Sequence, residues 1–256
     1  MSKNNTLFIG KVYQEFDTLP STNRYALDLL AQGKPPEGLV ISAAFQSEGQ
    51  GQMGNRWEGQ AGMNLALSVI LYPVFLPPQQ QFALNQAAAL AVRDLTASYI
   101  EKPVFVKWPN DIYVQQRKIA GILIQNTLSS STMLSSVVGV GLNVNQLAFS
   151  PELPNPTSLR LEAGTSFHRQ ELWPALCCQF ERRYLQLKAG RLAQLQADYL
   201  GCLYGYQRPC RFERLDGEQF QGEIRGIGPQ GHLLVAHEKG EEAFQFKQIK
   251  LLGLIL

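Results

Sequence analysis

The residues best suited to chemistry lie in one short stretch. Residues 107–111 read Lys-Trp-Pro-Asn-Asp, and Lys118 follows seven residues after Asp111. Proline has no amide hydrogen and disfavours helix at the residue before it, so the backbone must turn at Pro109. The run therefore predicts a hairpin with Lys107 and Asp111 at its edges. A lysine ammonium at the end of a sheet can meet a carboxylate or phosphate and stabilise a charged transition state.

Glycines close to these residues suggest that something approaches the backbone closely. Taken alone, Lys107 and Lys118 could each be solvated lysines at a strand edge, which is the commonest fate of this residue. Gly121, however, is unusual inside a strand and indicates close approach. The segment from Gly139 to Asn143 ends another strand in the same way. A plain β-bulge is the alternative explanation there.

A glycine-rich loop precedes this region. Residues 49–54 fit the dinucleotide pattern G-x-G-x-x-G, which is a weak signal alone. Residues 56–62 cannot form the crossover helix, and no acidic residue lies about twenty positions on, so we reject a Rossmann fold. A flexible solvated loop and a lid over a small ligand remain as alternatives. Arg56 and Trp57 favour the lid, because an exposed linker has little use for a tryptophan.

Other familiar site motifs do not occur in the chain. The P-loop, zincin and hydrolase-elbow patterns are absent, and the three histidines are isolated in the sequence. The four cysteines form no Cys-x-x-Cys pair, and Cys177 and Cys178 fall in a helical pattern typical of a core. We therefore expect no redox or metal role for the cysteines.

Composition describes an ordinary globular protein. The 256 residues are 45% hydrophobic and 17% charged, with a net charge of +2, so a full core is expected. This charge gives no general attraction to nucleic acid or an anionic membrane. The most apolar stretch, residues 65–76, is shorter than the roughly 20 residues that cross a bilayer. The polar first residues argue against a secretory signal, so we predict a cytoplasmic protein.

Hydrophobic periodicity predicts the elements that position these residues. Strands are expected at 12–16, 39–45, 64–71, 104–108, 112–115, 118–126 and 133–140, and helices at 22–31, 79–99, 171–187 and 192–200. Ser21 is well placed as the N-cap of the first helix. This order predicts an α+β fold with a mixed or antiparallel sheet and flanking helices.

The composition shifts near residue 206. Short runs at 210–214, 219–225, 232–236 and 243–246 alternate with glycine-containing turns. About fifty residues in this pattern predict a small β-barrel. We therefore expect a first domain at 1–204 and a second at 205–256.

In this order, the motifs resemble those of the biotin protein ligases. The matching segments are Ser21 to Asn23, Gln46, Gly49 to Trp57, Lys107 to Asp111, Arg117 to Leu123, and Gly139 to Asn143. The resemblance implies a class II synthetase-like catalytic domain followed by an SH3-like barrel. It also implies that biotin and ATP, with magnesium, give biotinyl-5′-AMP. A lysine of a biotin carboxyl carrier protein then takes the biotin.

The resemblance also implies site residues. Lys118 and Asp111 correspond to catalytic positions, with magnesium held beside ATP near Asp111 and not by a cage of protein ligands alone. A cation is needed because the biotin carboxylate and the α-phosphate repel each other. The implied biotin contacts are Ser21, Thr22, Asn23, Gln46, Gln50, Gly51, Gln52, Lys118, Gly121 and Gly139. The implied nucleotide contacts are Arg56, Trp57, Asn110, Asp111 and Asn143.

The chain departs from the family pattern in the glycine-rich loop. Relatives usually carry arginines where this chain has Gln50, Gln52 and Asn55, which leaves Arg56 as the charge that could hold phosphoryl oxygens. We expect weaker retention of the adenylate. The alternative is that backbone amides of the loop hold the phosphate and the side chains matter little.

Two rival functions and two partner questions accompany the resemblance. A lipoate or octanoate ligase or transferase shares the fold, but the 107–111 run favours biotin. A non-catalytic biotin-binding module is disfavoured by the presence of Lys118 and Asp111.

Only about twenty residues precede Ser21, too few for a winged-helix domain, so we expect no DNA binding. A homodimer stays open.

Overall fold

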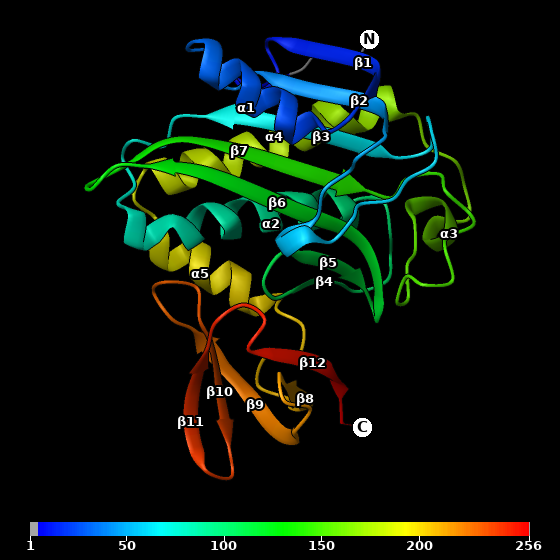
Figure 1. The fold of residues 1–256 in the computed structure, drawn as a ribbon. Coiled ribbons are helices and arrows are strands. Elements are labelled where there is room, and N and C mark those ends of the chain that lie inside the picture. Colours follow the sequence, from blue (N-terminus) through cyan, green and yellow to red (C-terminus); the bar gives the residue numbers. More distant parts are fainter. Residues whose placement is uncertain (1–4, 256) are drawn as a thin grey trace.

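A computed structural model, describing residues 5–255, contains a large mixed sheet flanked by helices and a small C-terminal sheet (Figure 1). The large sheet has the strand order β1-β2-β3-β7-β6-β5-β4. β1 and β2 are parallel and the other neighbours are antiparallel. The strands are β1 (Tyr13–Leu19), β2 (Val40–Gln46), β3 (Leu65–Leu71), β4 (Val104–Lys107), β5 (Asp111–Val114), β6 (Arg117–Leu128) and β7 (Met133–Leu142). The predicted α+β class is confirmed.

Helices cover both faces of this sheet. They are α1 (Thr22–Gln32), α2 (Gln81–Ala97), α3 (Leu159–Ala163), α4 (Arg169–Lys188) and α5 (Leu192–Gly201), with 3₁₀ turns η1 (Gln52–Gly54) and η2 (Pro78–Gln80). The main core lies between the sheet and α2 with α4, and a smaller cluster lies under α1 on the opposite face. No helix within residues 5–255 combines the length and hydropathy needed to cross a bilayer.

Strand β3 shows how the sheet divides its side chains between the two faces. Leu67 and Val69 belong to the main core, whereas Ile70 belongs to the cluster under α1. Successive residues of a strand point to opposite faces, so Ser68 shares the face of Ile70. A strand buried on both faces is expected to be almost continuously apolar. Ser68 is therefore a polar exception, fully buried on the α1 side.

Strand β6 contains a bulge beside its most important lysine. Ile112 pairs with Ala120 but Tyr113 pairs with Lys118, so Ile119 is an extra residue on β6. Without the bulge, Lys118 would point to the same face as Ala120, into the main core. The bulge turns Lys118 to the opposite face, since bulges re-aim side chains in this way. At Gly139, where the sequence left a bulge open, the register of β7 is regular.

The C-terminal residues form a five-stranded antiparallel sheet of order β11-β10-β9-β8-β12. Its strands are β8 (Pro209–Arg214), β9 (Gln219–Ile227), β10 (Leu233–His237), β11 (Gly240–Phe244) and β12 (Ile249–Leu254). It packs beside the β4 and β5 end of the large sheet (Figure 1). The Trp108 Nε1–H donates to Gly231 O at 2.9 Å, and the Gln196 side chain donates to Ile227 O.

One helix and one strand were not predicted. Helix α3 has only five residues, too few to show a helical period. Strand β12 begins at Ile249, shortly after residues 243–246, where a different strand was expected. The strand in that region, β11, lies earlier than expected because it begins at the turn residue Gly240. The remaining predicted strands and helices are present, with ends shifted by a few residues.

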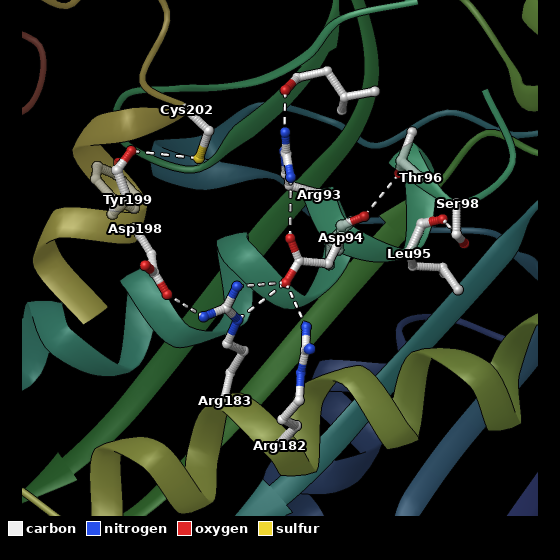
Figure 2. Close-up of polar contacts among 12 residues, drawn as sticks. Arg93, Asp94, Leu95, Thr96, Ser98, Arg182, Arg183, Asp198, Tyr199 and Cys202 are labelled. Carbon is white, nitrogen blue, oxygen red and sulfur yellow. Dashed lines mark hydrogen bonds and ion pairs between the residues drawn. The ribbon is translucent and has the colours of Figure 1, made fainter. Parts of the chain in front are cut away.

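One partly buried carboxylate links the helical layer (Figure 2). Asp94 on α2 accepts from Arg183 at 2.7 and 3.0 Å and from Arg182 at 2.9 Å, both on α4. Arg183 also contacts Asp198 on α5 at 2.5 Å. The side chains of Asp94 and Arg183 are 12% and 13% exposed, so this pair is largely shielded from solvent, whereas Arg182 lies at the surface. It connects three helices that lie behind the sheet.

We predict that Asp94→Ala lowers the free energy of unfolding by about 2 kcal/mol, because it removes the hydrogen bonds that Asp94 accepts from Arg183 and leaves Asp198 as the carboxylate that pairs with Arg183. Urea denaturation measures this change. Arg225→Ala is the control, since Arg225 pairs with Glu223 at an exposed site and its loss should cost less than about 1 kcal/mol. Equal losses in the two variants would contradict the role of Asp94.

Candidate active site

One cavity of about 520 Å³ brings together nearly all of the residues predicted for the site. It lies between the start of α1, the loop after β2, the β4–β5 turn and the C-terminal sheet. The predicted residues that line it are Ser21, Thr22, Asn23, Gln46, Gln50, Gly51, Gln52, Arg56, Trp57, Asn110, Asp111, Lys118, Gly121 and Gly139. Asn143 is the exception.

The start of α1 supplies several polar groups to the cavity. Ser21 caps the helix, as predicted, and its hydroxyl accepts from the Arg24 amide. The amide and hydroxyl of Thr22 both donate to Gln46 Oε1, at 2.8 and 3.0 Å. Buried polar groups need such partners. The helix start and the end of β2 are therefore held together as one polar surface.

Residues that the sequence did not indicate extend this polar surface. Ser68 Oγ lies 2.6 Å from Asn23 Oδ1, and the Asn23 amide donates to Gln125 Oε1 at 3.0 Å. Ser68 is fully buried and Gln125 lies on β6. A serine within an apolar strand was the available signal for Ser68. Nothing local marks Gln125, because its role depends on the pairing of distant strands.

Glycines on β6 and β7 make room for side chains that cross the sheet. A Cβ at Gly139 would lie 2.2 Å from Asn23 Oδ1, and one at Gly141 would lie 2.4 Å from the Trp57 ring. Gly141 pairs directly with Gly121, which also faces Trp57. The expected close approach at these glycines is confirmed, and here the approaching groups belong to the chain itself.

The glycine-rich loop is a small closed hairpin. Gln50 and Arg56 form an antiparallel bridge, and the Gly51 amide donates to Asn55 O at 2.7 Å. The Arg56 guanidinium donates to Ser47 O at 3.0 Å. These bonds order the loop at the cavity and set Trp57 on the glycines of the sheet.

Charged groups converge at the other side of the cavity. Lys118 Nζ lies 2.7 Å from Asp111 Oδ1. Lys107 pairs with Asp111 across the β4–β5 hairpin, as predicted, and its ammonium lies 4.8 Å from the centre of the Tyr113 ring. Burial lowers the pKa of Lys107; the Asp111 carboxylate opposes this, while Lys118 and Lys250 add to the lowering. The cations outnumber the carboxylate, so an anionic ligand is favoured here.

The β4–β5 turn is fixed from behind. Trp108 and Pro109 are joined by a cis peptide bond. The Asn85 side chain on α2 and the Tyr199 hydroxyl on α5 both donate to Pro109 O, at 2.7 and 3.4 Å. The Asn110 side chain donates to Ile122 O at 2.6 Å. The turn that carries Asp111 is therefore held by the helical layer and by β6.

Asn143 lies outside the residues that line the cavity. Its backbone amide donates to Ile119 O at 2.9 Å, and its side-chain amide donates to Thr157 O at 2.9 Å. It is buried beside the bulge of β6. The resemblance implied a nucleotide contact here, and that contact stays a prediction: the side-chain amide bonds to Thr157, while among the described residues Asn143 Oδ1 has no hydrogen-bond partner.

The C-terminal sheet forms part of the cavity wall, which the sequence did not reveal. The cavity is lined by Leu215, Phe246, Lys247 and Lys250, none of which was among the predicted contacts. Lys107, which the sequence singled out without assigning it a ligand, lines the cavity as well. Leu215 is 78% exposed although it lies at this cavity. Its position depends on how the C-terminal sheet docks, and a local sequence pattern does not report docking.

The carboxylate of Asp111 lines the cavity and is available to bind a cation there. Among residues 5–255, no group of three or more histidine, cysteine or acidic residues could hold a metal ion. Asp111 offers carboxylate oxygens at the cavity, and Mg²⁺ commonly takes one or two carboxylates together with substrate phosphates. The residues present therefore fit magnesium that arrives with a nucleotide.

We predict that Gly141→Ala displaces Trp57 and loosens the loop, because the new Cβ would overlap the ring. Trypsin should then cleave after Arg56 at least about fivefold faster, since proteolysis reports local opening. Gly33→Ala is the control, as Gly33 has extended backbone and open space around it. Cleavage of both variants at the same rate would contradict this packing.

Comparisons with known proteins agree with the geometry. The model for the biotin/lipoate A/B protein ligase family matches residues 15–143. The chain is 33% identical over 231 residues to the biotin–[acetyl-CoA-carboxylase] ligase of Mycobacterium tuberculosis, covering 88% of this chain and 84% of that protein. It is 31% identical over 238 residues to the bifunctional ligase/repressor BirA of Bacillus subtilis, covering 92% and 72%.

A solved structure has the same fold. The biotin protein ligase from Aquifex aeolicus in complex with biotin and ATP aligns with a TM-score of 0.78 at 22% identity, covering 94% of this chain and 98% of that one. The matched family model extends across the cavity residues of the large sheet. The chain therefore belongs to the biotin/lipoate A/B protein ligase family, among its biotin protein ligases.

Proposed function

We propose that this chain attaches biotin to a specific lysine of a biotin carboxyl carrier protein, using ATP and passing through biotinyl-5′-AMP. The observation that carries the proposal is the Lys118–Asp111 pair, with Nζ and Oδ1 2.7 Å apart. The same cavity is lined by the polar groups at the start of α1. Relatives named as biotin ligases, and a fold neighbour described with biotin and ATP, support the same activity.

The first step joins two anions. A biotin carboxylate oxygen bonds to the α-phosphorus of ATP. The bond between the α-phosphorus and the oxygen that bridges it to the β-phosphorus breaks, so that diphosphate leaves. The reactants repel each other, and a cation held between them lowers this barrier. We assign this role to Lys118, with Asp111 orienting its ammonium. Lys107 adds positive charge from the neighbouring strand.

The second step transfers the biotinyl group. The amine of the carrier lysine attacks the acyl carbon of the mixed anhydride and loses a proton, and the bond from acyl carbon to phosphate oxygen breaks, releasing AMP. The same cation stabilises negative charge on the leaving phosphate. The products are an amide on the carrier, AMP and diphosphate.

The cavity has two chemically different ends. We assign biotin to the end formed by the polar groups of Ser21, Thr22, Asn23 and Gln46, because its ureido ring offers two donors and one acceptor. The loop residues Gln50, Gly51 and Gln52, with Gly121 and Gly139, complete this end. We assign the nucleotide to the end near Arg56, Trp57, Asn110 and Asp111, where an aromatic ring offers a stacking surface. Asp111 would also hold the Mg²⁺ that accompanies the phosphates.

The two sheets define the proposed domains. We assign catalysis to residues 1–204 and an SH3-like domain to residues 205–256. The four cysteines are free thiols, which fits a reducing compartment, and we place the reaction in the cytoplasm.

Incubation with biotin, MgATP and a carrier domain, followed by mass measurement of the carrier, tests the function. We expect one biotinyl group on one lysine, dependent on ATP. Replacing biotin with lipoate or octanoate should give no addition. A carrier that gains lipoyl or octanoyl but not biotin would overturn the proposal, as would biotin binding without transfer.

We predict that Lys118→Ala lowers biotin-dependent exchange between ATP and diphosphate at least about tenfold, because losing one such charged donor commonly costs 10²- to 10³-fold. Radiolabelled diphosphate measures the exchange. Lys188→Ala, which removes an exposed lysine at the end of α4, is the control and should exchange normally. Near-normal exchange by Lys118→Ala would remove Lys118 from its assigned role.

We predict that Gln52→Arg slows adenylate release, because it restores a cation that can hold phosphoryl oxygens. Dissociation of radiolabelled biotinyl-5′-AMP should slow by about tenfold, and stray labelling of bystander proteins should fall with it. Gln60→Arg adds the same charge to the same loop outside the cavity and serves as the control. If Gln52→Arg changes neither quantity, backbone amides rather than side chains hold the phosphate.

A further inference from the structure

The bulge that aims Lys118 at the cavity is held by a segment far along the chain. The Lys118 amide donates to Asn155 O, and the Thr157 amide donates to Lys118 O, both at 2.8 Å. Residues 118 and 156 thereby form an isolated parallel bridge. Both backbone polar groups of Lys118 are thus bonded to residues 155–157, which belong to no helix or strand.

This support compensates for the irregular ladder on the other side. Because of the bulge, β5 skips Ile119 when it pairs with β6. The carbonyl of Ile119 accepts instead from the Asn143 amide. A bulge leaves its extra residue without a regular partner, so its geometry depends on what else holds it. Here Asn143 and residues 155–157 provide that support.

Residues 155–157 are themselves anchored by one buried carboxylate. The Thr157 hydroxyl donates to Glu162 Oε1 at 2.5 Å, and Thr157 O accepts from the Asn143 side chain. Thr157 is fully buried and the Glu162 side chain has no exposed surface. Such groups are costly to bury unless they are paired, so each depends on the other.

The carboxylate of Glu162 also holds the start of β6. Glu162 Oε1 lies 2.7 Å from an Arg117 guanidinium nitrogen, and Glu162 Oε2 lies 3.0 Å from Lys102 Nζ. Arg117 is the residue before Lys118, and consecutive strand residues point to opposite faces. Glu162 therefore fixes the strand through Arg117 on one face and through Thr157 at the backbone of Lys118.

We infer that Thr157 and Glu162 are positioning residues for catalysis, which set the direction of the Lys118 ammonium without touching the ligand. Neither residue lines the cavity. The inference rests on the proposed function of Lys118 and adds to it. A displacement of a catalytic charge by about 1 Å can lower the rate about 10²-fold. Loss of the Thr157–Glu162 contact should therefore slow turnover while leaving substrate binding nearly intact.

A double-mutant cycle with Lys118→Ala tests the inference, using exchange between ATP and diphosphate as the rate. Thr157→Val keeps the side-chain shape and removes the hydroxyl. It should lower kcat about tenfold, with KM for biotin and ATP within about twofold. In the Lys118→Ala background it should lower the rate less than about twofold, because residues that act through one group are not additive. Thr157→Ser should restore most of kcat.

Thr96→Val is the matched control. Thr96 is also fully buried, and its hydroxyl donates to Val92 O at 2.8 Å within α2, outside the cavity lining. It should leave kcat unchanged even where the melting temperature falls. Glu162→Gln is the second variant, which keeps a partner for Thr157 and removes the charge that pairs with Arg117. It should lower kcat about threefold, again without effect when Lys118 is absent.

The outcomes separate the two ideas. If Lys118→Ala exchanges normally, the assigned role of Lys118 fails and this inference falls with it. If Lys118→Ala is slow but Thr157→Val and Glu162→Gln behave like Thr96→Val, only the inference is overturned. A further loss in the Lys118→Ala background equal to that in the intact chain would also overturn it, because the effect would then not pass through Lys118.

Discussion

The site depends on one extra residue in β6. Strand alternation would send Lys118 toward the core, with Ala120 and Ile122, and the bulge at Ile119 reverses it. The ammonium then lies beside Asp111, whose own position is set by a turn held from the helical layer. A single charge pair is thus built from two strands, β6 and β5, which different contacts hold in place. Charges that are held in place in advance need no reorganisation at the moment of reaction.

Close packing across the sheet shapes the rest of the cavity. Glycines at 121, 139 and 141 let side chains from α1 and the loop lie directly on the backbone of β6 and β7. Asn23 thereby joins the helix start to the sheet, and Trp57 joins the loop to it. Polar groups at one end and an aromatic surface at the other give the cavity two kinds of wall.

The sequence predicted what depends on local periodicity and chain order. The α+β class, the cap at Ser21 and the hairpin between Lys107 and Asp111 follow from patterns within a few residues. The direction of Lys118 did not, since the alternation of the strand points it the wrong way. Gln125, Leu215 and Lys250 were missed because their places are set by strand pairing and docking. Asn143 lies beside the bulge of β6 and outside the cavity lining, a place that spacing alone does not give.

The wall contributed by the C-terminal sheet has a thermodynamic consequence. Phe246 and Lys250 meet the cavity from one side while Trp108 and Lys118 meet it from the other, and Trp108 also bonds to Gly231. Any molecule that touches both sides binds more tightly when the two sheets are docked. Linkage then requires that the molecule strengthens the docking by the same free energy. Occupancy of the cavity and cohesion of the two sheets are therefore one coupled equilibrium.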